Sequence, residues 1–144
     1  MTRYKLTPAV SVALIKDNKI LLIRRNDQAS FAPGLYHCPG GHVDADETIR
    51  QAAAREVFEE VGAIIDVDDL EFVHLLHRKG QTEEYLISFF IVRIWEQEPF
   101  NKEPHKHDML DWCSIDNLPD TMIPAHRAAL IDSFNGIVYS EYGW

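Results

Sequence analysis

Two short apolar segments rich in β-branched residues lie near the start of the chain, with a polar tetrapeptide between them. Val10–Ile15 and Ile20–Arg25 have the composition of strands, and Lys16-Asp17-Asn18-Lys19 is typical of the turn of a hairpin. Patterns of the same kind predict further strands at Leu35–Cys38, Glu71–His77, Tyr85–Trp95 and Leu110–Ile115.

A loop begins at Pro39-Gly40-Gly41 and leads to a segment with helical periodicity. From Thr48 to Val61 apolar side chains recur at every fourth position, which predicts a helix. Asp44 and Asp46 are candidate N-terminal caps of this helix, and Gly62 is a candidate C-terminal cap.

Pro124–Phe134 predicts a second helix, because proline is well suited to a first helical turn and Gly136 follows the end of the segment. Strands on both sides of one helix, with a second helix to cover the other face, predict an α+β fold in which a mixed β-sheet lies between helices. The length of 144 residues favours a single domain, residues 1–144. The N-terminal pattern predicts neither a signal peptide nor a membrane span, so we expect a cytoplasmic protein that does not associate with membranes.

Charge and cysteine content exclude some functions. The net charge of −9 argues against a protein that binds nucleic acid, because such binding depends mainly on lysine and arginine. Two cysteines, Cys38 and Cys113, are too few for a disulfide framework and lack the paired spacing of a zinc site, so we expect packed thiols. If phosphates bind here, a divalent cation held by carboxylates is the means of neutralising them.

Three acidic residues of the predicted helix, Glu56, Glu59 and Glu60, are spaced so that their carboxylates share one face. Like charges at this spacing repel one another unless a cation lies among them, and oxygen ligands with phosphate chemistry favour Mg²⁺. The alternative interpretation is an acidic helix face exposed to solvent.

The surrounding residues favour the metal site. From Gly41 the chain follows the pattern Gly41-x5-Glu47-x7-Arg55-Glu56-Val57-x-Glu59-Glu60-x-Gly62, which resembles the Nudix box. Besides Val57, seven fixed residues at this spacing match by chance less than about once in a million. The segment departs from the family pattern at Ala63, where a bulky aliphatic residue is usual, and we expect Ile64 to fill that space.

The resemblance covers Gly41 to Ala63 directly and most of the chain more loosely. It implies the Nudix α/β/α sandwich and a Mg²⁺ cofactor, with Mn²⁺ as a possible substitute. It also implies an ion pair between Glu47 and Arg55 that joins loop and helix. The metal ligands it implies are the backbone carbonyl of Gly41 and the carboxylates of Glu56, Glu59 and Glu60.

The implied reaction is hydrolysis of a nucleoside diphosphate linked to another group, with release of a monophosphate. A carboxylate must orient or deprotonate the attacking water. Glu59 and Glu60 are candidates, and so is Glu103, because Glu103-Pro104-x-Lys106 is similar to an element that carries this glutamate in several relatives. The alternative for Glu103 is an ordinary loop carboxylate.

Four residues are candidates for substrate binding. Arg25 ends a strand at a position where similar enzymes place an arginine on the phosphates, and Phe31, Tyr36 and His126 are candidates for a base pocket. Each has a plainer interpretation as a core or surface residue. His105 and His107 have the spacing of a metal pair, but an oxygen-preferring site favours exposed histidines in the polar loop Glu96–Asp108.

The stretch from Glu103 to Trp112 is similar to the subgroup that acts on nucleoside and oxidised purine nucleoside triphosphates, so the expected substrate is a purine nucleoside triphosphate such as 8-oxo-dGTP. The alternatives are an ADP-ribose or nucleotide-sugar pyrophosphatase, hydrolysis of dihydroneopterin triphosphate, and a nucleotide sensor without turnover. The intact set of glutamates argues against the sensor. The expected partner is therefore a small nucleotide, bound by a monomer or a homodimer.

Overall fold

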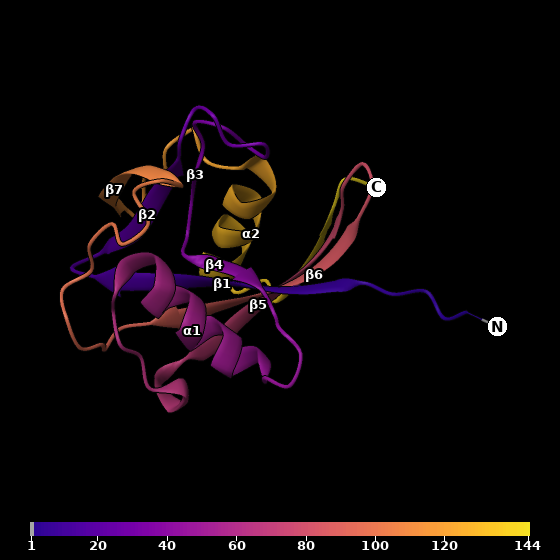
Figure 1. Ribbon diagram of the computed structural model, residues 1–144, viewed down its shortest axis with the longest axis horizontal. Coiled ribbons are helices and arrows are strands. Elements are labelled where there is room, and N and C mark those ends of the chain that lie inside the picture. Colours follow the sequence, from indigo (N-terminus) through magenta and orange to yellow (C-terminus); the bar gives the residue numbers. More distant parts are fainter. Residues whose placement is uncertain (1) are drawn as a thin grey trace.

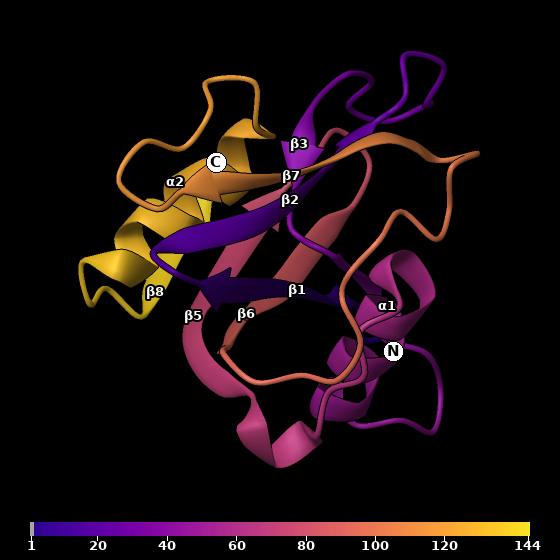
Figure 2. The ribbon, with the colours of Figure 1, turned by 90° about the vertical axis from the view of Figure 1, so that its left-hand side faces the viewer.

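The computed structural model describes residues 2–144, in which a mixed sheet lies between two helices (Figure 1). Turning the molecule by 90° places α1 and α2 on opposite sides of the strands (Figure 2). The elements, in chain order, are β1 (Thr7–Lys16), β2 (Lys19–Arg25), β3 (Tyr36–His37), β4 (Gly40–His42), α1 (Ile49–Val61), the 3₁₀ turn η1 (Val67–Asp69), β5 (Glu71–Lys79), β6 (Glu84–Val92), β7 (His107–Ser114), α2 (Pro124–Phe134) and β8 (Tyr139–Tyr142).

The sheet is built around β1. Its strand order is β3-β2-β1-β6-β5-β8, with β4 paired to β1 and β7 paired to β2. β1 runs parallel to β6 and antiparallel to β2 and β4. Asp17 and Asn18 close the predicted β1–β2 hairpin with φ angles of 53° and 60°, the left-handed region that suits the right-handed twist of two strands.

Alternate side chains of β1 enter different halves of the core, as the two-residue period of a strand requires. Ala9, Ala13 and Ile15 belong to a buried cluster that includes α2 residues, whereas Val10, Val12 and Leu14 belong to a second cluster that includes α1 residues. Both faces of the strand are therefore covered by a helix, which explains its nearly continuous apolar sequence.

The predicted fold class is confirmed, and the second predicted helix has the observed bounds. Some boundaries were wrong. Strand β6 ends at Val92 rather than at the predicted Trp95, and β7 begins at His107 rather than at the predicted Leu110. Two strands were not predicted: β4, in the segment taken as the start of a loop, and β8, which follows α2.

Two local predictions were also wrong. Neither Asp44 nor Asp46 caps α1, because Thr48 holds the N-cap position. Ile64 does not fill the space beside Ala63: Ala63 itself is fully buried, whereas Ile64 is 41% exposed and forms a backbone bridge with Glu96. Among residues 2–144, no helix has the length and apolar content needed to span a membrane.

Candidate active site

Helix α1 is fixed at both ends. At its start Thr48 and Gln51 form a reciprocal capping box: the Gln51 N–H donates to Thr48 Oγ1 at 3.1 Å, and the Thr48 N–H donates to Gln51 Oε1 at 2.9 Å. At its end Gly62 adopts φ 74°, and its N–H donates to the Phe58 carbonyl. The buried face contains Ala53 and Val57, so the glutamates of the helix lie in a fixed position relative to the sheet.

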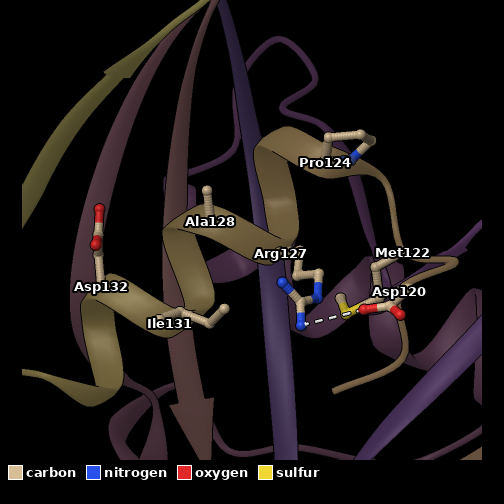
Figure 3. A pocket seen from close by; sticks show the side chains of 7 residues that line it. All are labelled: Asp120, Met122, Pro124, Arg127, Ala128, Ile131 and Asp132. Carbon is tan, nitrogen blue, oxygen red and sulfur yellow. Dashed lines mark ion pairs between the residues drawn. The ribbon is translucent and has the colours of Figure 1, made fainter. Parts of the chain in front are cut away.

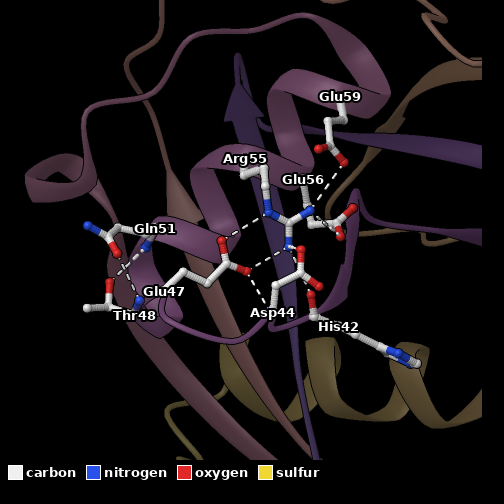
Figure 4. Close-up of polar contacts among 8 residues, drawn as sticks. All are labelled: His42, Asp44, Glu47, Thr48, Gln51, Arg55, Glu56 and Glu59. Carbon is white, nitrogen blue, oxygen red and sulfur yellow. Dashed lines mark hydrogen bonds and ion pairs between the residues drawn. The ribbon is translucent and has the colours of Figure 1, made fainter.

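Arg55 joins the loop before α1 to the glutamates on it (Figure 4). Its Nε donates to Glu47 Oε2 at 3.0 Å and its Nη2 to Glu47 Oε1 at 2.8 Å, which is the two-point pairing implied by the resemblance. Nη1 donates to Glu56 Oε1 at 3.0 Å and to Glu59 Oε2 at 3.2 Å, and Nη2 also donates to the His42 carbonyl at 3.0 Å. The bonds from Arg55, with a further bond from the Asp44 N–H, lower the pKa of Glu47 to about 2, so this carboxylate stays ionised.

The carboxyl groups of Glu56 and Glu60 lie against strand β4. A Cβ atom at Gly41 would stand 2.5 Å from Glu56 Oε1, so only glycine leaves room for that carboxylate. Glu60 accepts a hydrogen bond from the Gly40 N–H and is only 6% exposed. Burial, and then the neighbouring charge of Glu56, raises the pKa of Glu60 well above its ordinary value, and burial also raises the pKa of Glu56.

This pair has the character of an incomplete cation site. Glu60 Oε2 is buried without a hydrogen-bond partner among the described residues, and an oxygen-binding divalent cation would satisfy it and relieve the repulsion from Glu56. Glu59 is arranged differently, because its carboxylate is half exposed and bonded to Arg55. Across residues 2–144, no three His, Cys, Asp or Glu side chains lie close enough together to hold a metal ion. The structure thus brings Glu56 and Glu60 together at Gly41 and leaves Glu59 beside Arg55.

Glu103 approaches the same region from a separate loop. Its charge contributes to the raised pKa of Glu60, which places the two carboxyl groups in the same neighbourhood. The Lys102 N–H donates to the Glu60 carbonyl at 3.1 Å and ties this loop to α1. Glu103 Oε2 pairs with Lys106 Nζ at 3.3 Å. The basic side chain of Lys106 therefore lies next to the Glu103 carboxylate, which borders the site.

A cavity of about 360 Å³ extends from Gly40 and Gly41 across the sheet. Three of the four predicted substrate-binding residues line it: Arg25, Phe31 and His126. The other residues that line it are Ala9, Val10, Ser11, His37, Cys38, His42, Arg78, Tyr85, Ile87 and Ile123.

Two arginines lie over the ring of Phe31 in this cavity. The guanidinium carbon of Arg25 is 5.5 Å from the ring centroid and that of Arg78 is 5.3 Å from it. Both cations border the cavity, so they are available to an anionic or carbonyl oxygen of a ligand. Arg78 had no local sequence signal, because β5 reaches the cavity only through its pairing with β6.

Tyr36, the fourth predicted residue, is not among the residues that line this cavity. Its hydroxyl donates to Asp111 Oδ2 at 2.7 Å, and this bond, together with burial, raises the pKa of Tyr36 to about 12. The prediction for His107 was wrong, because this side chain is 3% exposed in β7, and burial lowers its pKa to about 4. His105 is exposed, as expected. Cys38 and Cys113 are free thiols.

A second cavity, of about 460 Å³, lies beside the outer surface of α2 (Figure 3). Arg127 and Asp120 form an ion pair of 3.6 Å at one end of it, and Met122, Pro124 and Ile131 contribute apolar walls. None of the glutamates of α1 lines it. These glutamates do not line the 360 Å³ cavity either, but that cavity includes Gly40 and Gly41, against which Glu56 and Glu60 lie, so it is the cavity next to the acidic pair.

Comparison with known proteins agrees with this geometry. The NUDIX domain family model matches residues 5–134. The CTP pyrophosphohydrolase of Escherichia coli (strain K12) is 32% identical over 132 residues, which are 90% of this chain and 92% of the relative. The 8-oxo-dGTP diphosphatase of the same strain is 32% identical over 127 residues, covering 88% of this chain and 94% of the relative.

Solved structures are similar over the same extent. A crystal structure of a MutT NUDIX hydrolase from Burkholderia pseudomallei superposes with a TM-score of 0.81 at 27% sequence identity. The match covers 89% of this chain and 98% of that one. The observed sheet and both helices thus have a counterpart in a solved structure.

Proposed function

Since this chain belongs to the NUDIX domain family and is a Nudix hydrolase of nucleotide derivatives, we propose that its substrate is a purine nucleoside triphosphate, including oxidised forms such as 8-oxo-dGTP. Water attacks a phosphorus atom, the phosphoanhydride bond breaks, and the products are the nucleoside monophosphate and pyrophosphate. The observation that carries this proposal is the pair Glu56 and Glu60 held against Gly40 and Gly41, where the 360 Å³ cavity ends.

Hydrolases of this family generally use divalent metal ions, and the proposed cofactor here is Mg²⁺. The residues that would hold it are Glu56, Glu59 and Glu60 with the carbonyl of Gly41. Bound there, the cation would offset phosphate charge and acidify a water molecule. The unpartnered Glu60 oxygen and the close approach of the Glu56 carboxylate to Gly41 fit such an ion.

The protein's own residues have separate tasks in this proposal. Arg55 keeps the carboxylates of Glu56 and Glu59 in place through its two bonds from Nη1. Glu103 accepts a proton from the attacking water, because it reaches the site from a separate loop and is not among the residues that would hold the cation. Arg25, which lines the cavity, contacts the phosphates.

A nucleotide with a larger second group, such as ADP-ribose or a nucleotide sugar, is the second candidate substrate. One observation favours it: a further cavity of about 610 Å³ shares Phe31, Arg78 and Tyr85 with the first one, so there is room beyond a nucleoside. The first candidate retains priority because of the resemblance around Glu103.

An activity screen tests these proposals. Nucleoside triphosphates, oxidised purine triphosphates, dinucleotides and nucleotide sugars are incubated with the protein and Mg²⁺, and monophosphate and pyrophosphate are quantified. We expect the highest kcat/KM for a purine triphosphate and no turnover in excess chelator, since clustered carboxylates repel a polyphosphate unless a cation lies between them. Turnover that survives the chelator would refute the metal site, and a higher kcat/KM for ADP-ribose would favour the second candidate. Tight binding without turnover would indicate a sensor.

A further inference from the structure

His37 is a buried polar residue of the cavity that the proposed reaction does not use. It lies on β3, is 8% exposed, and is one of the residues that line the 360 Å³ space. Its Nδ1 is 2.7 Å from the carbonyl oxygen of Cys38. A carbonyl oxygen only accepts hydrogen bonds, so Nδ1 carries the proton in this pair.

The other ring nitrogen is then an acceptor. Protonation of both nitrogens is unfavourable, because burial, together with the proximity of His126, His107 and Arg25, lowers the pKa of His37 to about 3. A neutral imidazole with its proton on Nδ1 has a lone pair on Nε2. Nε2 of His37 is buried and has no hydrogen-bond partner among the described residues. Buried polar atoms are nearly always paired, so this nitrogen is free to accept a hydrogen bond from a ligand in the cavity.

The charged side chains of the cavity cannot accept a hydrogen bond from a ligand. Arg25 and Arg78 offer only donors, and they suit phosphate or carbonyl oxygens. His126, which also lines the cavity, has a buried Nδ1 without a hydrogen-bond partner in residues 2–144, and burial lowers its pKa to about 4, so it too is neutral. The cavity thus places a hydrogen-bond acceptor in a space that is also lined by two guanidinium groups.

We propose that Nε2 of His37 accepts a hydrogen bond from an N–H group on the base of the nucleotide, which makes His37 a specificity-determining residue. This inference rests on the proposed function, because it assumes that the cavity holds the base. The ligands it selects are nucleotides whose base has an amino or ring N–H group. Bases without any N–H leave Nε2 unpaired in the complex and are disfavoured.

The test compares substrates that differ in this one donor. ATP and GTP have N–H groups on the base, whereas purine riboside triphosphate has none. We expect the wild-type kcat/KM for the better of ATP and GTP to exceed that for purine riboside triphosphate by about 10-fold to 100-fold. His37→Met removes the acceptor at similar volume and should reduce this ratio to near one, whereas His37→Gln restores an acceptor oxygen and should recover part of it. His105→Phe, in the exposed loop, is the matched control and should keep the wild-type ratio.

Binding of the products gives a second measurement that does not depend on turnover. Calorimetric titration with AMP, GMP and purine riboside monophosphate measures their affinities. The ratio of the better of the AMP and GMP affinities to that of purine riboside monophosphate should be highest for wild type, intermediate for His37→Gln and near one for His37→Met. If wild type hydrolyses triphosphates but the ratio is unchanged in His37→Met, the role of His37 is refuted and the proposed function stands.

If no triphosphate is hydrolysed, the proposed function fails, and the monophosphate titrations decide the role of His37 separately. If His37→Met and His37→Gln do not fold, equal wild-type affinity for AMP, GMP and purine riboside monophosphate refutes the inference.

Discussion

Glu60 has a carboxyl group in a place that solvent hardly reaches, which is costly for the folded protein and useful for its chemistry. Its neighbour Glu56 has the same sign of charge, and the Gly40 N–H is the backbone donor that faces it. A buried carboxylate without enough partners destabilises the fold unless it is neutralised. The site therefore keeps a side chain that serves the reaction and lowers the stability of the folded protein.

Replacing Glu60 by Gln separates these two effects. In chelator, we expect Glu60→Gln to raise Tm by about 3 °C, because the amide removes a buried negative charge worth roughly 1 kcal/mol. With Mg²⁺ present, kcat/KM should fall by about 10³-fold, or roughly 4 kcal/mol. Glu59→Gln is the control, since Glu59 is half exposed and its Tm should change little. A lower Tm for Glu60→Gln would show that the buried charge of Glu60 does not destabilise the folded protein.

Glu103 is expected to behave differently from the helix glutamates. Glu103→Gln should lower kcat by roughly 10²–10⁴-fold while leaving the tightest Mg²⁺ affinity nearly unchanged, because this residue acts on water and not on the cation. Mg²⁺ titration and kcat at saturation measure the two quantities. Glu98→Gln, an exposed neighbour on the preceding segment, is the matched control. Wild-type kcat in Glu103→Gln would assign the proton transfer to the helix.

At the scale of elements, α1 holds two of the acidic groups in place, and its capping box fixes where it begins. Thr48→Ala removes the side-chain acceptor for the Gln51 N–H, so the free energy of unfolding should fall by about 1 kcal/mol. Thr48→Ser keeps the hydroxyl and should resemble wild type. Denaturant titration monitored by circular dichroism measures both. Equal stability of the Ala and Ser variants would mean that the cap does not stabilise the helix.

Much of the element pattern could be predicted because it depends on local sequence. The apolar, β-branched composition of β1 and β2, the glycine at the end of α1 and the proline at the start of α2 are local signals. β4 and β8 have no such signal: β4 is a glycine pair that becomes a strand only by pairing with β1, and β8 only by pairing with β5. Their hydrogen bonds depend on partners far away in the sequence.

The residues of the candidate site also fall into those with a local sequence signal and those without one. Glu47, Arg55 and the helix glutamates follow from the spacing of one short segment. Arg78 and His37, in contrast, reach the cavity from strands whose positions are set by the sheet, so their contribution is visible only in three dimensions. His107 was misassigned because a histidine in a polar stretch has no local signal of burial.

At the scale of the whole molecule, three buried neutral histidines make stability depend on pH. Burial lowers the pKa of His37 to about 3 and the pKa values of His107 and His126 to about 4. The unfolded chain binds protons at these positions below about pH 6.5 and the folded chain does not. Acidification from pH 6.5 to pH 4 should therefore lower the free energy of unfolding.

Chemical denaturation at several pH values tests this dependence. His126→Gln should have a shallower decline than wild type between pH 6.5 and pH 4, because one of the three groups no longer titrates. His105→Gln alters an exposed histidine and should keep the wild-type slope. Identical slopes for all three proteins would show that the pH dependence comes from other groups.

The central position of β1 also has a consequence for how the protein forms. Thr7 pairs with Tyr85, more than half the chain away, so during synthesis β1 emerges from the ribosome long before β6 exists. Throughout that interval the edge of β1 that pairs with β6 has no partner, and the face that packs toward α2 is not yet covered. Contacts between such distant segments slow folding, and exposed apolar strands of this kind are the segments from which aggregation begins. The strand that organises the finished sheet is thus the one that most needs protection, by a chaperone or by rapid elongation, while the nascent chain is incomplete.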